Sequence, residues 1–106
     1  LPTLPQKVVL QILRILQEAL NNIYKHANAQ NIWFEVCYSK NIGSLRFLVM
    51  DDGIGLRLET VTKRGCGLSN MSQRARQIGA DLQVCNRLNA DGAMVELVFN
   101  KVNDEN

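Results

Sequence analysis

A long helical periodicity in residues 6–27 limits the folds that are open to this chain. The run has no glycine or proline, and its apolar side chains recur at steps of three and four residues at Val8, Val9, Ile12, Leu16, Ala19, Leu20 and Ile23. This spacing predicts one amphipathic helix. A helix that is apolar on one face needs a second layer to cover that face.

Four β-rich runs can supply the second layer. Residues 31–39 and 45–50 are rich in branched and aromatic side chains and flank a short polar turn, which predicts an antiparallel hairpin. Residues 81–87 and 93–99 predict two further strands around a turn that contains Asn89, Ala90, Asp91 and Gly92.

Between the two strand pairs we expect a loop over residues 51–64 and a second helix over residues 68–78, with Gly79 closing it. The order is therefore helix, two strands, helix, two strands. It predicts an α/β (α+β) two-layer sandwich, in which a mixed, mainly antiparallel sheet carries its helices on one face.

Composition and length fit one globular domain over residues 1–106. With 46% hydrophobic and 21% charged residues, the chain has ordinary globular composition, and no apolar run is long enough to span a bilayer. The formal net charge of +2 comes from scattered basic residues, so we expect no nucleic-acid partner and no membrane contact by this domain. The start, Leu-Pro-Thr, shows no signal peptide. Because the first residue is not Met, we expect a piece of a longer protein.

The cysteines and the histidine predict neither a metal site nor a hydrolase. Cys37, Cys66 and Cys85 form no C-x-x-C pair, and only one histidine is present to join them. A reducing cytoplasm is the expected environment. With a single histidine placed in a helix, the sequence does not indicate a Ser-His-Asp or Cys-His catalytic arrangement.

One polar stripe follows the edge of the first helix. Glu18, Asn22 and His26 are four residues apart, with Lys25 beside them, so all could reach one ligand. An Asn carbonyl is a hard oxygen that suits Mg²⁺, and a glutamate could orient or deprotonate a water or hydroxyl. The stripe can equally be the polar border of an amphipathic helix, and we interpret His26 as a site wall or helix cap rather than a phosphoacceptor.

A carboxylate followed by two glycines comes directly after the second strand. Asp51, at a strand end, could accept a hydrogen bond from the exocyclic amine of adenine, and Gly53 and Gly55 would allow close approach of a flat base or a positive φ. An ordinary Asp-Gly turn is the alternative.

A second glycine pair opens the second helix. Gly65, Gly67 and Leu68 would present free N–H groups and a positive helix end to nucleotide phosphates, unless they are only a hinge between loop and helix. Residues 56–64 are the natural candidate for a lid, with Lys63 and Arg64 near its end, where both could equally be solvated.

Together these segments resemble the GHKL ATPase superfamily, which includes DNA gyrase B, MutL and histidine kinases. Residues 15–27, I-L-Q-E-A-L-N-N-I-Y-K-H-A, resemble the N box of NarX, NarQ, UhpB and DesK sensor kinases. Residues 51–56, D-D-G-I-G-L, resemble the G1 box, and residues 65–75, G-C-G-L-S-N-M-S-Q-R-A, resemble G-x-G-L-x-G-M-x-E-R-A. The departures are Cys66 for a frequent His, Asn70 for Gly, Ser72 for Arg, and Ala93 in the last Gly-Thr pair.

The resemblance implies a Bergerat-type ATP-binding fold with ATP and Mg²⁺ as cofactors. By this resemblance Asn22 holds Mg²⁺, Glu18 occupies the place of the hydrolytic base of the ATPases, and Asp51 bonds the adenine amine. Gly53 and Gly55 would shape the base pocket. The expected neighbours of the phosphates are Lys25, His26, Lys63, Gly65, Gly67 and Leu68.

The resemblance also implies a larger protein around this domain. It would be a bacterial two-component sensor histidine kinase, with a dimerisation and phosphoacceptor domain upstream, a membrane anchor and a response regulator of the LuxR/NarL type as partner. The chain alone would bind ATP but not autophosphorylate. An anti-sigma-factor serine kinase, a nucleotide-binding module without turnover and a structural domain that binds no nucleotide are the alternatives.

Overall fold

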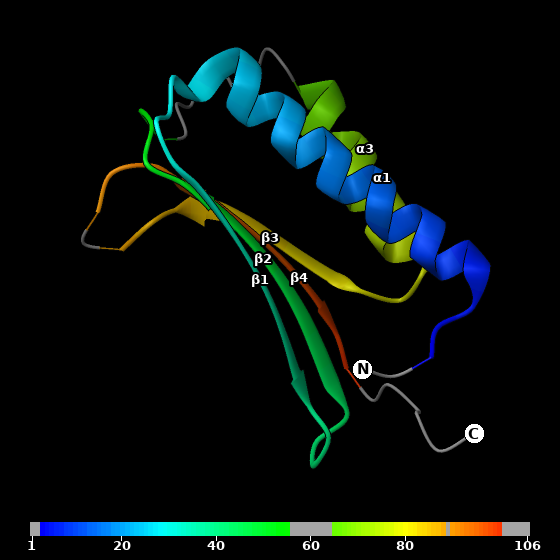
Figure 1. Cartoon of the computed structure of the whole chain (residues 1–106). Helices are drawn as coiled ribbons and strands as arrows, with labels where there is room; N and C mark the ends of the chain where they lie inside the picture. Colours follow the sequence, from blue (N-terminus) through cyan, green and yellow to red (C-terminus); the bar gives the residue numbers. More distant parts are fainter. Residues whose placement is uncertain (1–2, 56–64, 89, 101–106) are drawn as a thin grey trace.

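The computed structural model describes residues 3–55, 65–88 and 90–100 and confirms a two-layer fold (Figure 1). The chain order is a helix that ends in a π-helical turn, two strands, a helix and two strands. Their bounds are α1 Gln6–Asn22, η1 Ile23–Ala27, β1 Ile32–Ser39, β2 Ser44–Asp51, α3 Gly65–Gln77, β3 Asp81–Asn86 and β4 Ala93–Phe99. Every predicted strand is present, with ends that differ from the prediction by no more than one residue.

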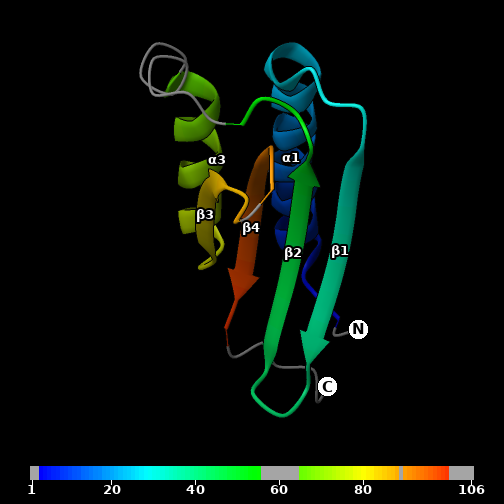
Figure 2. The ribbon, with the colours of Figure 1, turned by 90° about the vertical axis from the view of Figure 1, so that its left-hand side faces the viewer.

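The four strands form one sheet in the order β1-β2-β4-β3. Each neighbouring pair is antiparallel, so the described sheet is antiparallel throughout rather than mixed. Both helices lie side by side on the same face of the sheet (Figures 1 and 2). No helix of the described residues is long and apolar enough to cross a membrane.

The first helix extends as far as predicted but changes its winding at the end. It starts after Pro5, whose carbonyl oxygen accepts the N–H groups of Val8 and Val9 at 3.0 and 3.1 Å. After Asn22 the backbone continues as the π-helical turn Ile23–Ala27, and Asn28 ends it in the left-handed conformation with φ 50°. A π turn bonds each residue to the fifth along, so four-residue spacing no longer returns to one face beyond Asn22.

The core lies between the helices and the three strands β2, β4 and β3. Ile15, Leu45, Met71 and Leu97 are its largest fully buried side chains and come from four different elements. Apolar contact between one helix stripe and one sheet face is the main source of stability in such a layer.

Strand β1 lies at the edge of the sheet, beyond the cover of the helices (Figure 2). Phe34 pairs with the buried Val49 and so points to the helix side, yet it is 54% exposed. Its position in the sheet, rather than its sequence pattern, therefore decides its exposure.

The second helix begins at Gly65, three residues before the predicted start at Leu68. It ends as expected. Gly79 has φ 72°, and the Ala80 N–H donates to the Ala75 carbonyl at 2.9 Å, which closes the last turn. The glycine pair at Gly65 and Gly67 thus forms the first turn of α3 instead of preceding it.

We expect Ile15→Ala to lower the free energy of unfolding by about 2–5 kcal/mol, because Ile15 is fully buried between helix and sheet. Leu13→Ala is the matched control, since Leu13 lies on the same helix and is 56% exposed. It should change stability by no more than about 0.5 kcal/mol. Urea unfolding followed by circular dichroism measures both, and equal losses would contradict the assigned core.

Candidate functional site

The predicted motifs meet at one end of the molecule. The π-helical end of α1, the end of β2, the start of α3 and the β3–β4 turn all lie at the same end of the two layers (Figure 1). The fold thus collects segments from four parts of the sequence around the Asp51–Gly55 segment.

Asp51 is a buried carboxylate at the last position of β2. It is 2% exposed, and β1 pairs with it through Ile32. Its Oδ1 accepts the N–H of Gly53 at 2.8 Å. Among the described residues no donor is recorded for its Oδ2. Such a carboxylate, fixed by the sheet and by one backbone N–H, can accept a hydrogen bond from a ligand amine.

Gly53 packs directly against the end of the first helix. A Cβ atom on Gly53 would overlap the carbonyl oxygen of Ala27, and the next residue, Ile54, donates its N–H to that same oxygen at 2.9 Å. The close approach at Gly53 is thus made by the protein's own backbone, whereas the sequence predicted the approach of a flat base or a positive φ. This contact joins the end of the N-box segment to the Asp51 segment.

Gly55 has a positive φ, which is one of the two possibilities that the sequence left open for this glycine pair. Its φ is 81°, and a Cβ atom there would lie 2.7 Å from Asn86 Oδ1. The two glycines therefore do different things: Gly53 allows a close contact, and Gly55 allows the chain to turn past the end of β3.

The residues of the predicted polar stripe divide between two kinds of helix: Glu18 and Asn22 lie in α1, and Lys25 and His26 lie in the π-helical turn. Glu18 and Asn22 are half-buried near the end of α1, and Lys25 is exposed in the π turn. His26 belongs to the same turn, but its side chain lies outside what the structure describes. The helix therefore carries Glu18 and Asn22 toward the end of the fold where Asp51 lies.

The structure describes some of the residues that the sequence predicted to lie beside the nucleotide phosphates. Gly65, Gly67 and Leu68 lie in the first turn of α3, where backbone N–H groups have no partner within the helix. The side chain of Leu68 and the whole of Lys63 and Arg64 lie outside the described residues. The predicted lid over residues 56–64 lies outside them as well.

Asp52 forms a junction that the sequence did not reveal. Its Oδ1 accepts the N–H groups of Gln30 and Asn31, and its Oδ2 accepts the Asn31 side-chain amide, each at 2.9 Å. These bonds, led by that from the Asn31 backbone, hold the pKa of the Asp52 carboxyl below its ordinary value. Twenty-one residues separate the partners, so no local pattern predicted the contact.

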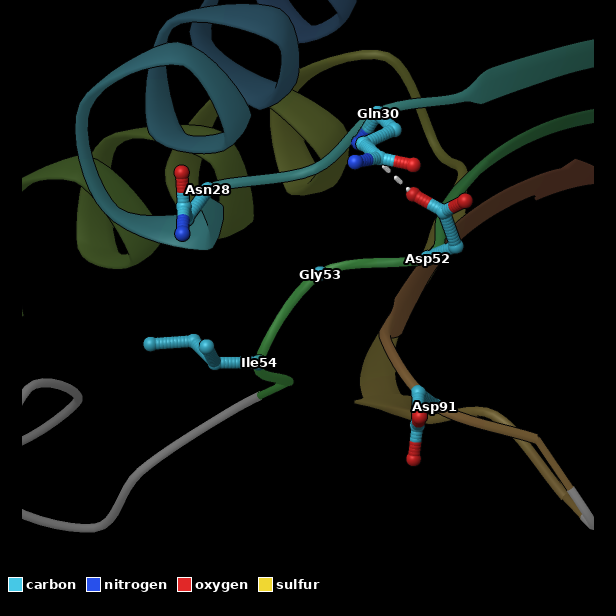
Figure 3. A pocket seen from close by; sticks show the side chains of 6 residues that line it. All are labelled: Asn28, Gln30, Asp52, Gly53, Ile54 and Asp91. Atoms are coloured by element: carbon cyan, nitrogen blue, oxygen red, sulfur yellow. Dashed lines mark hydrogen bonds between the residues drawn. The ribbon is translucent and has the colours of Figure 1, made fainter.

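A pocket of about 510 Å³ opens beside this junction (Figure 3). It shares Gly53 with the expected nucleotide site but lies by the carboxylates of Asp52 and Asp91. Its other lining residues are Asn28, Gln30 and Ile54. Two carboxylates repel a triphosphate, so this pocket is a poor place for nucleotide phosphates.

Two more residues fix Asp51 without having been predicted to do so. Gly92 has φ 105°, and a Cβ atom there would overlap the Asp51 carbonyl oxygen. Arg87 donates from its guanidinium to that same oxygen at 3.3 Å. A glycine in a turn was visible in the sequence, but its contact with β2 depends on the strand order.

We expect Gly53→Ala to lower the free energy of unfolding by about 1–3 kcal/mol or more, because the methyl group would push Ala27 away from the Asp51 segment. Ile54→Ala is the control, since Ile54 is 51% exposed and its backbone bond to Ala27 is kept. Thermal unfolding compares the two variants. A Gly53→Ala chain as stable as Ile54→Ala would contradict the backbone junction.

Acid should weaken the Asp52 junction. Because the pKa of Asp52 is lower in the folded chain than its reference value of 3.8, its stabilising contribution is present above that value and is lost as the pH falls through the folded pKa. Urea unfolding from about pH 5 to about pH 2 should show that the free energy of unfolding falls more steeply for the wild type than for Asp52→Asn. Asn31→Ala should move the pKa of Asp52 upward in a carboxyl NMR titration. Parallel unfolding curves and an unmoved pKa would contradict this.

Comparison with known proteins identifies the family. The profile described as "Histidine kinase-, DNA gyrase B-, and HSP90-like ATPase" matches residues 7–103. Sensor histidine kinase LiaS of Bacillus subtilis is 31% identical over 86 residues, which make up 81% of this chain and 23% of LiaS. Sensor protein VraS of Staphylococcus haemolyticus is 29% identical over 104 residues, covering 96% of this chain and 29% of VraS. The chain thus spans less than a third of either relative.

Solved structures agree in fold. The histidine kinase domain of a blue-light activated histidine kinase from Erythrobacter litoralis superposes with a TM-score of 0.74 at 22% identity, covering 91% of this chain and 46% of that one. The mycobacterial sensor histidine kinase MprB gives 0.67 at 19% identity, covering 85% of this chain and 70% of that one. The chain therefore belongs to the family of histidine kinase-, DNA gyrase B- and HSP90-like ATPases, as the kind of ATP-binding domain that sensor histidine kinases carry.

Proposed function

We propose that the chain binds Mg-ATP at the Asp51 end of the fold, as the catalytic domain of a two-component sensor histidine kinase. The observation that carries the proposal is the Asp51 carboxylate, which is buried and held by the Gly53 N–H, with no described donor at its Oδ2. An ionised carboxylate accepts several hydrogen bonds, so the Asp51 oxygens can still take a donor from a ligand. The exocyclic amine of adenine is a donor that suits them.

The remaining roles follow the order of the motifs. Asn22 is proposed to hold Mg²⁺ through its side-chain oxygen, and Glu18, one turn earlier, to orient the reacting groups. Gly53 and Gly55 shape the wall beside the base. The proposed phosphate neighbours are Lys25, His26, Lys63, Gly65, Gly67 and Leu68. The free N–H groups of the first turn of α3 suit an anion, which supports this assignment for Gly65 and Gly67.

In this proposal the domain positions the nucleotide and stabilises the charge of its phosphates. Bound Mg²⁺ would supply neutralisation of the phosphate charge. Asp51 would orient the base, and the first turn of α3 would orient the phosphates, so that the γ-phosphoryl group faces a histidine of the dimerisation domain. By itself the chain would bind ATP without phosphorylating itself.

The setting in the whole protein is also a proposal. The relatives are named a sensor histidine kinase and a sensor protein and are several times longer than this chain, which supports a full-length homodimer with its own phosphoacceptor domain and a response regulator. The LuxR/NarL class of that regulator, the NarX, NarQ, UhpB and DesK subfamily, the membrane anchor and the cytoplasmic location of this domain rest on the sequence resemblance. The names of the relatives favour a sensor kinase over an anti-sigma-factor kinase.

Calorimetry with ATP and Mg²⁺ on this chain, repeated with Asp51→Asn, tests the proposal. The asparagine keeps an acceptor for the Gly53 N–H, but its amide nitrogen cannot accept the adenine amine, so we expect the affinity to fall by about tenfold to a hundredfold. Asp91→Asn is the control, because the Asp91 side chain is exposed and lines the neighbouring pocket, and its backbone carbonyl is kept. No binding by the wild type, or equal affinities for wild type and Asp51→Asn, would contradict the proposal.

A further inference from the structure

Arg87 joins three segments of the chain at the end of the sheet. Its guanidinium Nη1 donates to the backbone carbonyls of Asp51 at 3.3 Å and Asp91 at 3.1 Å. The same guanidinium lies over the ring of Trp33, with 4.8 Å between its central carbon and the ring centroid. Arg87 therefore contacts β1, the end of β2 and the β3–β4 turn at once.

The hydrogen bond to Asp51 fills a gap in the β ladder. The pairing of β2 with β4 stops at Met50 and Met94, so Asp51 has no partner on β4. On its other side Asp51 is paired with Ile32 of β1. The guanidinium of Arg87 takes the place of the missing strand neighbour, and the backbone of Gly92 packs against the same carbonyl.

The ring of Trp33 limits where the guanidinium can go. Trp33 pairs with Met50, one position from the Ile32–Asp51 pair, so its side chain points to the face opposite the helices. Arg87 reaches the Asp51 carbonyl from this outer face, while the Asp51 side chain lies on the helix side with Val49. The cation is held between an aromatic face and two carbonyl oxygens, which a planar guanidinium suits better than an ammonium.

We propose that Arg87 is a positioning residue for adenine recognition, acting through the backbone of Asp51. This inference rests on the proposed function, in which the Asp51 carboxylate accepts the adenine amine. A hydrogen bond weakens steeply with misalignment, and the direction of the carboxylate is set by the backbone that carries it. Removing the hydrogen bond from Arg87 to the Asp51 carbonyl should therefore weaken recognition of the adenine amine more than binding of the rest of the nucleotide.

The test compares two nucleotides in the presence of Mg²⁺: ATP, and purine riboside triphosphate, which lacks the 6-amine. Their dissociation constants are measured by calorimetry for this chain and for Arg87→Met, Arg87→Lys and Arg46→Met. Arg46 is the matched control, because it is exposed on the same outer face and its guanidinium pairs with Glu96 of β4 at 3.3 Å instead of with the Asp51 carbonyl. Thermal unfolding of each variant confirms that it is folded.

We expect the wild type to prefer ATP by about tenfold or more, since the amine bonds a charged group. Arg87→Met and Arg87→Lys should each reduce this preference at least threefold, while Arg46→Met keeps it. An unchanged preference in Arg87→Met, or an equal loss of affinity for both nucleotides, would overturn the inference and leave the proposed function standing. If Arg87→Lys kept the full preference for ATP, the inference would also be overturned, since a positive charge alone would then be enough to position Asp51. A wild type without preference would overturn the assignment of Asp51 itself.

Discussion

The backbone contact between Ala27 and the Gly53–Ile54 segment determines where the rest of the site lies. The Ala27 carbonyl, at the end of the π-helical turn, accepts the Ile54 N–H, and only a residue without Cβ fits at Gly53. This contact attaches the end of the helix that carries Glu18 and Asn22 to the loop that begins at Asp51. If it were lost, the helix and the strand would no longer share one site.

Two other contacts keep Asp51 in place from the opposite sides of its strand. Asp52 bonds Gln30 and Asn31 on the β1 side, and Arg87 bonds the Asp51 carbonyl on the β4 side. A carboxylate that is held in this way needs little reorganisation when a ligand binds, and a preorganised acceptor gives specificity at low entropic cost. The same arrangement explains why a short turn such as that at Gly92 matters to a site built mainly on α1 and β2.

Local patterns predicted most of the fold. The periodicity of residues 6–27, the β-rich runs and the closing glycine Gly79 each have a local physical cause, so their elements were predictable. The π-helical winding of Ile23–Ala27 was not, because nothing in I-Y-K-H-A breaks a helix and the contact with Gly53 is distant in sequence. The exposure of Phe34 also depends on which strands the helices cover.

The site was predictable to the extent that its residues lie in contiguous motifs. Asp51 ends a strand and Gly55 has a positive φ, and both features have a local cause, whereas the close contact of Gly53 with Ala27 joins segments that are distant in sequence. Arg87 and Trp33 come together only through the strand order β1-β2-β4-β3, which the sequence alone did not specify. The Asp52 junction joins the residue after β2 to Gln30 and Asn31, which precede β1.

A crystal structure of this chain with Mg²⁺ and a non-hydrolysable ATP analogue tests the central claim most directly, because it locates the base without any substitution. We expect the exocyclic amine of adenine within hydrogen-bonding distance of the Asp51 carboxylate, with the phosphates toward the first turn of α3. A base bound elsewhere, such as in the pocket beside Asp52 and Asp91, would contradict the claim.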